Sequence, residues 1–222
     1  LNIPQENWIS LIARRSYGLG ENLGGEVSLF DLVKTSMRHR PDVLIVGEIR
    51  GNEAYVLFQA LATGHGGMCT MHATDIDSAV KRLTSKPMDI ASAYVPLMNV
   101  VASVQRVNLE AAGEMRAYRR IVSVDEIADY EDYRNVFKWK PVADSFNASS
   151  KKGIMLSSIS EHMGKSEKEL IEELQHRQNV LHWMRKRNIR SYKDVASVIS
   201  EYYARPKEFY KEEVEAEAIA VT

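Results

Sequence analysis

The chain has 222 residues, 45% of them hydrophobic, so it is long enough to bury one large core or one medium and one small core. Its 29 basic and 30 acidic residues give a net charge of −1, which offers no general argument for binding nucleic acid or an anionic membrane. The single cysteine, Cys69, excludes a disulfide or a four-cysteine zinc site within these residues, and no apolar run reaches the ~18 residues of a spanning helix.

The first hundred residues predict an alternation of strands and helices. Ser28, followed by Asp31 three positions later, predicts the start of a helix, and Pro41 predicts that this helix has ended. Gly64 stands where the C-terminal cap of a later helix belongs. After the first helix we expect a strand, a helix, a strand and a helix at 43–49, 52–63, 67–72 and 75–86. This order is typical of a parallel α/β sheet.

The pattern changes near residue 100. Strand-like segments follow, the first two joined by a predicted hairpin loop, at 100–109, 115–127 and 136–147. After a polar break at 147–153, two helices are expected at 165–187 and 191–203. We therefore predict an α/β fold with two domains, 1–146 with the sheet and 147–222 with the helices.

Glu48 stands where the first buried strand ends. In open α/β sheets, ligands bind at the carboxyl ends of the strands. A carboxylate there can polarise a water for attack on a phosphoryl group, or hold Mg²⁺ directly or through water. The alternative is a surface glutamate that pairs with Arg50 beside it, and the strand pattern leaves both interpretations open.

Two histidines flank the next strand. His65 lies in a glycine-rich turn before it and His72 follows it, and we expect both to reach the same sheet edge as Glu48. Imidazole N–H groups at that edge can donate to a phosphate. The alternatives are a metal site, although the spacing is not a recognised zinc pattern, and two histidines that cap loops.

A nucleotide-binding loop of the form G-x-x-x-x-G-K-[ST] is absent from these residues. The stretch GLGENLGGEV at 18–27 has glycines at the right distance, but Glu26 occupies the lysine position. The stretch MGKS at 163–166 has Ile159 in place of the first glycine, and we expect it to begin a helix instead.

Two longer stretches together resemble the secretion ATPase superfamily of type II secretion, type IV pilus and archaellum motors. LVKTSMRHRPDVLIVGEIRGNEA at 32–54 is similar to the family's atypical Walker B box, in which Gly precedes the catalytic Glu. ALATGHGGMCTMHATDIDSAVKRL at 60–83 is similar to its His box. With only Cys69, the four-cysteine zinc insertion of many bacterial members is missing, which favours the archaeal branch.

The resemblance implies that 1–146 is part of a RecA-like P-loop NTPase core, a mostly parallel sheet flanked by helices, that works with ATP and Mg²⁺. Glu48 would activate the attacking water, and His65 and His72 would sense the γ-phosphate. Gly47 would take the usual Walker B aspartate position. The other residues that the resemblance assigns to nucleotide binding are Arg38, Arg50, Thr63, Gly64 and Thr70.

The resemblance also implies a motor for secretion or pilus assembly. Such a motor is a homohexameric ring in the cytoplasm, peripherally associated with the cytoplasmic membrane through an integral membrane platform protein, and we expect no nucleic acid partner. Because Walker A is absent here, we expect a part of a longer motor that hydrolyses little ATP alone. The alternatives are a non-catalytic assembly or regulatory module of a RecA-like ring and a DNA-translocating RecA-like ATPase.

Overall fold

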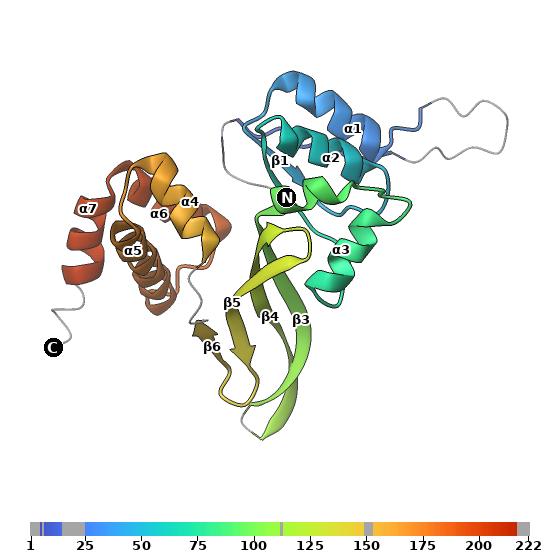
Figure 1. Ribbon diagram of the computed structural model, residues 1–222. Coiled ribbons are helices and arrows are strands. Elements are labelled where there is room, and N and C mark those ends of the chain that lie inside the picture. The colour runs from blue at the N-terminus through green and yellow to red at the C-terminus, as the bar shows by residue number, and fades with distance from the viewer. Residues whose placement is uncertain (1–4, 6, 15–24, 112, 149–152, 217–222) are drawn as a thin grey trace. The chain divides into compact units, whose positions relative to one another are not determined.

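The computed structural model describes residues 5, 7–14, 25–111, 113–148 and 153–216 (Figure 1). These residues form two compact units. The α/β unit comprises 11–155, and the helical unit comprises 1–10 together with 156–222. We expected a domain boundary after residue 146, and the division into units falls between Met155 and Leu156. The assignment of a separate role to each part stays a prediction.

The first helix of the α/β unit begins at the predicted cap. Helix α1 (Leu29–Ser36) starts after Ser28, whose hydroxyl accepts a hydrogen bond from the Asp31 N–H at 3.1 Å. The Asp31 carboxylate accepts in return from the Ser28 N–H at 3.3 Å, which completes a capping box. A 3₁₀ turn, η1 (Met37–His39), follows, and the helical segment ends before Pro41 as predicted.

Two parallel strands follow, connected by a helix. Strand β1 (Val43–Val46) pairs with β2 (Gly66–Cys69), and α2 (Glu53–Ala62) makes the crossover between them. The register pairs are Val43–Gly66, Leu44–Gly67, Ile45–Met68 and Val46–Cys69. The predicted strand–helix–strand unit is confirmed, and its register brings the carboxyl ends of the two strands side by side.

Apolar side chains from these elements fix α2 on β1. The buried cluster that they form consists of Val33, Leu44, Val46, Ile49, Ala54, Val56, Leu57, Phe58, Ala60, Leu83, Met88 and Ile90. Helix α3 (Ile76–Thr84) begins where the Asp75 carboxylate accepts from the Ser78 N–H at 2.8 Å. With η2 (Ser92–Met98), α3 packs on the second sheet through Val80, Val95 and Ile127.

The second sheet is antiparallel and four-stranded. Its strands follow the chain order β3 (Val100–Ala111), β4 (Glu114–Asp129), β5 (Asp132–Lys140) and β6 (Ser145–Ala148). The predicted hairpin region is confirmed, but the single strand expected at 136–147 is interrupted by a turn. Parallel pairing is confined to β1 and β2 in the described residues, and the antiparallel sheet lies in the predicted hairpin region. The α/β class is thus confirmed, and a RecA-like core stays a prediction.

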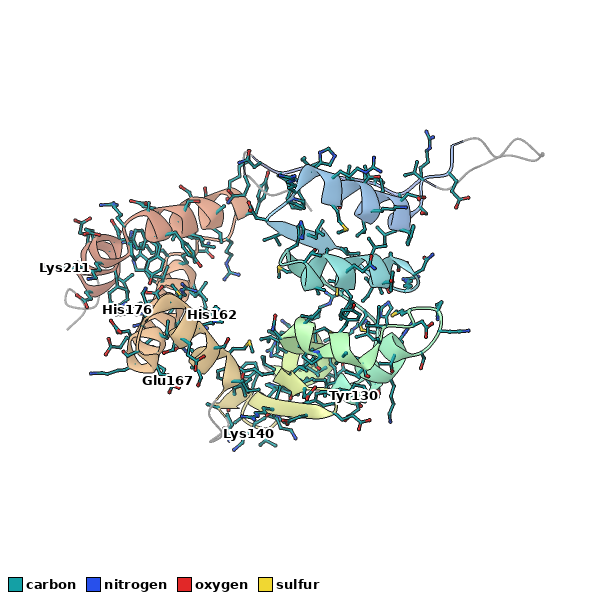
Figure 2. All side chains as sticks on the ribbon, turned by 45° about the horizontal axis from the view of Figure 1, so that its top comes forward. Tyr130, Lys140, His162, Glu167, His176 and Lys211 are labelled. Atoms are coloured by element: carbon teal, nitrogen blue, oxygen red, sulfur yellow. The ribbon has the colours of Figure 1, made fainter. Side chains whose placement is uncertain are left out.

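The helical unit is built from short packed helices. They are α4 (Ile154–Met163), which begins in the α/β unit, α5 (Glu167–Lys186), α6 (Tyr192–Ala204), α7 (Pro206–Phe209) and the π-helical η3 (Tyr210–Glu215). Ser166 caps α5, which confirms that the GKS stretch starts a helix. His176 stacks on Tyr210 with ring centroids 4.0 Å apart (Figure 2). Among the described residues, no helix is both long and apolar enough to cross a membrane.

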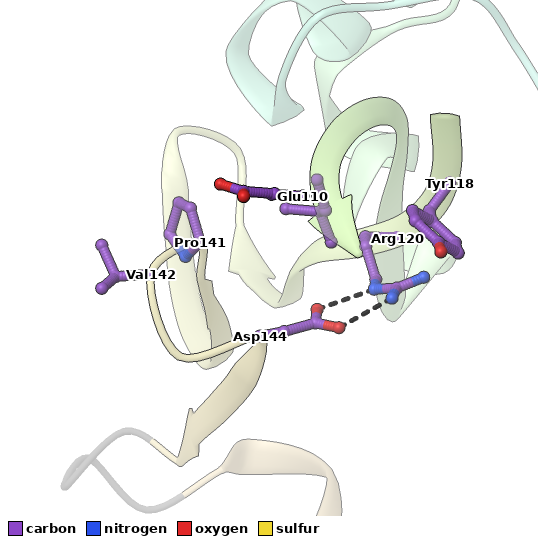
Figure 3. A pocket seen from close by; sticks show the side chains of 7 residues that line it. Glu110, Tyr118, Arg120, Pro141, Val142 and Asp144 are labelled. Atoms are coloured by element: carbon purple, nitrogen blue, oxygen red, sulfur yellow. Dashed lines mark hydrogen bonds and ion pairs between the residues drawn. The ribbon is translucent and has the colours of Figure 1, made fainter. Parts of the chain in front are cut away.

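A charged clamp joins the turn after β5 to strand β4 (Figure 3). Arg120 donates from Nε and Nη2 to the two carboxylate oxygens of Asp144, both at 2.7 Å. Trp139 Nε1 donates to the same carboxylate at 2.8 Å. The three donors hold the turn in place, because a carboxylate accepts two parallel guanidinium bonds only in a narrow range of orientations.

This clamp predicts a pH dependence of stability. Hydrogen bonds from Arg120 and Trp139 lower the pKa of Asp144 to about 2. The clamp therefore contributes fully above the unfolded pKa of about 3.9, and its contribution is lost as the pH falls toward about 2. We expect Asp144→Asn to lower the urea midpoint of unfolding at neutral pH, measured by circular dichroism. Between about pH 4 and pH 2, the midpoint of this variant should decrease less steeply with pH than that of wild type. Asp132→Asn, whose carboxylate lies 3.9 Å from Arg134, is the control. An Asp144→Asn profile equal to wild type would contradict the account.

Candidate functional site

Glu48 lies at the carboxyl edge of the parallel strands, as predicted. Beyond β1, the chain stays tied to the segment after β2, because the Ile49 N–H donates to the Thr70 carbonyl at 2.9 Å. The Thr70 hydroxyl donates to the Gly47 carbonyl at 2.6 Å. These two bonds hold the backbone on both sides of Glu48 against the segment that leads to His72.

The Glu48 carboxylate faces two of the predicted residues. Its Oε2 lies 2.6 Å from Arg50 Nη2, and its Oε1 lies 3.1 Å from His72 Nε2. The Glu48 side chain is 27% exposed, whereas those of Arg50 and His72 are 67% and 77% exposed. Glu48 is thus set back behind two accessible nitrogen-bearing side chains.

The two oxygens of Glu48 differ in their bonding. Oε2 accepts the hydrogen bond from Arg50. Oε1 is shielded from solvent, and the nitrogen beside it is His72 Nε2 at 3.1 Å, which forms an ion pair with it when the imidazole is protonated. Both oxygens of Glu48 therefore face nitrogen-bearing side chains, one a guanidinium and the other an imidazole.

Positive charge surrounds this carboxylate. The hydrogen bond from Arg50, with the charges of Arg50, His72 and Arg82, holds the pKa of Glu48 below its usual value, against the opposing effect of partial burial. The same contact raises the pKa of Arg50. The site therefore carries an ionised carboxylate and at least two guanidinium groups near neutral pH, an excess of positive charge that suits an anion.

A second glutamate holds the loop that follows Glu48. Glu53, at the start of α2, is buried, and its Oε1 accepts from the N–H groups of Arg50 and Gly51 at 2.5 and 2.9 Å. This carboxylate satisfies two backbone donors ahead of the helix, where negative charge is also favourable. Glu53 thereby fixes the backbone from which Arg50 reaches Glu48.

His65 does not join this cluster, so the expected convergence of three side chains is wrong. Gly66 pairs with Val43 and its N–H donates to the Asp42 carbonyl at 2.9 Å, so His65 lies at the amino edge of the sheet. The whole of β1, Val43–Val46, separates Asp42 from the segment of Glu48, and at about 3.3 Å per residue this strand alone spans roughly 10 Å. His65 Nδ1 instead lies 3.2 Å from the Ala60 carbonyl, at the end of α2.

Three other predicted residues also lie away from Glu48. Thr63 donates its hydroxyl to the Ala60 carbonyl at 2.9 Å, and Gly64 adopts φ 92° after α2, so both terminate that helix. Arg38 is exposed in η1, before β1, and has no interaction partner among the described residues. Of the predicted set, Gly47, Glu48, Arg50, Thr70 and His72 are thus brought together.

Two members of the cluster were missed from the sequence. Arg82 in α3 donates Nη1–H to the His72 carbonyl at 2.7 Å, and Glu53 holds the loop. Both act on backbone groups, and such contacts leave no periodic pattern. The available signals were weak: a glutamate three positions after Arg50, and an arginine on the helix that follows His72.

Another hollow lies on the antiparallel sheet, between Tyr118, Pro141 and the Arg120–Asp144 pair (Figure 3). Arg120 and Asp144 neutralise each other there. None of the predicted site residues lines this hollow, so the cluster around Glu48 remains the candidate site.

Comparison with known proteins identifies the family. The model of the family described as type II/IV secretion system protein matches residues 4–209. The chain belongs to the type II/IV secretion system protein family. The resemblance predicted from the sequence is confirmed at this level.

Relatives of this type II/IV secretion family chain come from archaea and bacteria. The uncharacterized protein MJ1287 of Methanocaldococcus jannaschii is 36% identical over 95% of this chain and 76% of the relative. The type IV secretion system protein PtlH of Bordetella pertussis is 35% identical over 54% of this chain. The probable conjugal transfer protein TrbB of Sinorhizobium fredii is 34% identical over 46% of this chain. The matches cover 37% of PtlH and 32% of TrbB.

The loop contact in this family member predicts a specific loss of stability. Glu53→Ala leaves the N–H groups of Arg50 and Gly51 without their acceptor, and hydrogen bonds to a charged group contribute about 1.5–3 kcal/mol. We expect the free energy of unfolding, measured in urea, to fall by about that amount. Glu172→Ala, at an exposed position on α5, should change it by less than about 0.5 kcal/mol. Equal stability of the two variants would show that Glu53 does not hold the loop.

Proposed function

We propose that this chain belongs to the ATP-hydrolysing motor of a type II secretion or type IV pilus-like system and forms part of a RecA-like core. Family membership over residues 4–209 supports a secretion-system ATPase. The single observation that carries the finer assignment is the position of Glu48 at the carboxyl edge of the parallel strands, where its carboxylate faces both Arg50 and His72.

Glu48 has the properties of a group that orients an attacking water. Its carboxylate is partly exposed beside Arg50 and His72, and a water held there would give a hydrogen bond, and then a proton, to the carboxylate. The lowered pKa keeps Glu48 ionised near neutral pH. In phosphoryl transfer, positioning and charge stabilisation provide most of the catalysis, so a weakly basic but well-placed carboxylate suffices.

The groups around Glu48 suit the negative charge of a terminal phosphoryl group. Arg50 is exposed at the mouth of the site, and His72 presents its Nε2 beside Glu48. Fixed donors aimed at developing charge stabilise a transition state more than water does, since they need no reorganisation. We assign Arg50 and His72 to contacts with phosphoryl oxygens.

The donor set fits ATP with a hydrated Mg²⁺. Glu53 is bonded to two backbone N–H groups, so Glu48 is the carboxylate of the cluster that is left to face a ligand. Mg²⁺ usually keeps several waters and binds through one or two carboxylates together with substrate phosphates. Glu48 would hold such a water, and Gly47 offers no side-chain ligand. When bound, Mg²⁺ supplies charge neutralisation at the phosphates.

We further propose that the motor works as a homohexameric ring on the cytoplasmic side of a membrane, against an integral membrane platform protein. The names of PtlH and TrbB, a type IV secretion system protein and a probable conjugal transfer protein, support a role in a transport machine.

Substitutions in the assembled motor to which the chain is proposed to belong test the site. Glu48→Gln should lower kcat for ATP by about 10²–10⁴-fold while ATP binding is retained, because it removes the acceptor for the proton of water. His72→Ala should lower kcat to a smaller extent. His65→Ala is the matched control, and its rate should stay close to wild type, since His65 lies at the opposite edge. Full turnover by Glu48→Gln would refute the assignment.

The 222 residues tested alone give a second prediction. They contain no G-x-x-x-x-G-K-[ST] motif, whose backbone N–H groups and lysine hold the phosphates in this class of enzyme. We expect the purified 222-residue chain to show no ATP turnover above that of its Glu48→Gln variant in a phosphate-release assay. Steady turnover that Glu48→Gln abolishes would show that these residues bind the phosphates without such a loop.

A further inference from the structure

Arg82 makes a contact that links α3 to the candidate site. Its Nη1–H donates to the carbonyl oxygen of His72 at 2.7 Å, across ten positions of the chain. His72 lies between β2 and α3, in a segment without regular secondary structure. Its carbonyl therefore takes no part in a strand or helix, and the guanidinium of Arg82 supplies its hydrogen bond.

The helix that carries Arg82 is firmly held. The Asp75 carboxylate caps α3 at the Ser78 N–H, and the neighbour of Arg82, Leu83, is completely buried in the core of the α/β unit. The side chain of Arg82 thus extends from a backbone that is fixed in place. A rigid planar donor on a fixed helix can define the position of a loop carbonyl more tightly than a water can.

Arg82 also adds charge at the site. It is among the groups whose positive charge lowers the pKa of Glu48. Within the described residues, the His72 carbonyl is the partner of Arg82, and its other N–H donors remain free for a bound anion or for water. Both the hydrogen bond to the His72 carbonyl and the positive charge of Arg82 therefore connect this residue with the Glu48 site.

We propose that Arg82 is a positioning residue, which holds the backbone of His72 so that the imidazole faces Glu48 and the terminal phosphoryl group. This inference rests on the proposed function of the Glu48 site. It assigns to α3 an indirect part in the chemistry, because a movement of this helix would carry the His72 backbone with it.

The first test uses the 222-residue chain and needs no nucleotide. Nuclear Overhauser contacts between the ring protons of His72 and the side-chain protons of Glu48 are followed by NMR in wild type, Arg82→Gln, Arg82→Lys and Lys81→Gln. Lys81→Gln is the matched control, since it removes the same charge one position away on α3. We expect Arg82→Gln, which loses the guanidinium that donates to the His72 carbonyl, to weaken these contacts and Lys81→Gln to keep them. Wild-type contacts in Arg82→Gln overturn the proposal.

The second test uses ATP turnover by the assembled motor to which the chain is proposed to belong. Arg82→Gln should lower kcat by about tenfold or more with little change in KM, the pattern of a group whose effect is felt in the transition state. The kcat of Arg82→Lys should lie between those of Arg82→Gln and wild type, because lysine keeps the charge but loses the planar fork. If Arg82→Gln does not fold, the kcat of Arg82→Lys is compared with that of Lys81→Gln. A wild-type kcat for the Arg82 variants overturns the proposal, whatever the NMR contacts show.

The two tests separate this proposal from the function on which it rests. If Glu48→Gln is inactive while the Arg82 variants are fully active, only the role of Arg82 is refuted. If Glu48→Gln turns over ATP normally, the proposed function itself fails, irrespective of the result for Arg82.

Discussion

The parallel register of β1 and β2 is the constraint on which the candidate site depends. Each of the four pairs from Val43–Gly66 to Val46–Cys69 is set by backbone hydrogen bonds, and the register fixes which loop residues meet beyond the strands. The bonds from Ile49 and Thr70 extend the contact past the strand ends. A slip by one residue would turn the side chains to opposite faces and separate Glu48 from His72.

Beyond the register, the site depends on carboxylates and guanidiniums that act on backbone groups as well as on each other. Glu53 holds the N–H groups after Glu48, and Arg82 holds the carbonyl of His72. Each is anchored on a helix that packs into the apolar core of the α/β unit. The core therefore determines the geometry of a cluster that is itself largely polar and partly exposed, and this explains how a small, open site can be well ordered.

Much of the fold could be predicted because its signals are local. The Ser28 capping box, Gly64 at the end of α2 and the apolar run of β1 each follow from the conformational preference of a few neighbouring residues. Features that depend on contacts between residues far apart in the sequence were harder to predict. The apolar residues of α5 lie on two faces, and periodicity alone could not show that Leu170, Val180 and Met184 are buried whereas Ile171, Leu174 and Leu181 are exposed. The turn that separates β5 from β6 depends on the Arg120–Asp144 pair, 24 positions apart.

The error over His65 has a simple physical origin. A residue before a parallel strand lies at the amino edge and a residue after it lies at the carboxyl edge, so two histidines on either side of β2 cannot share a small ligand. The central claim is that Glu48 and His72 meet there without His65. Nuclear Overhauser contacts between the side-chain protons of Glu48 and the ring protons of each histidine, in the 222-residue chain, measure this directly. The account predicts contacts to His72 and none to His65, and contacts to His65 without contacts to His72 would contradict it.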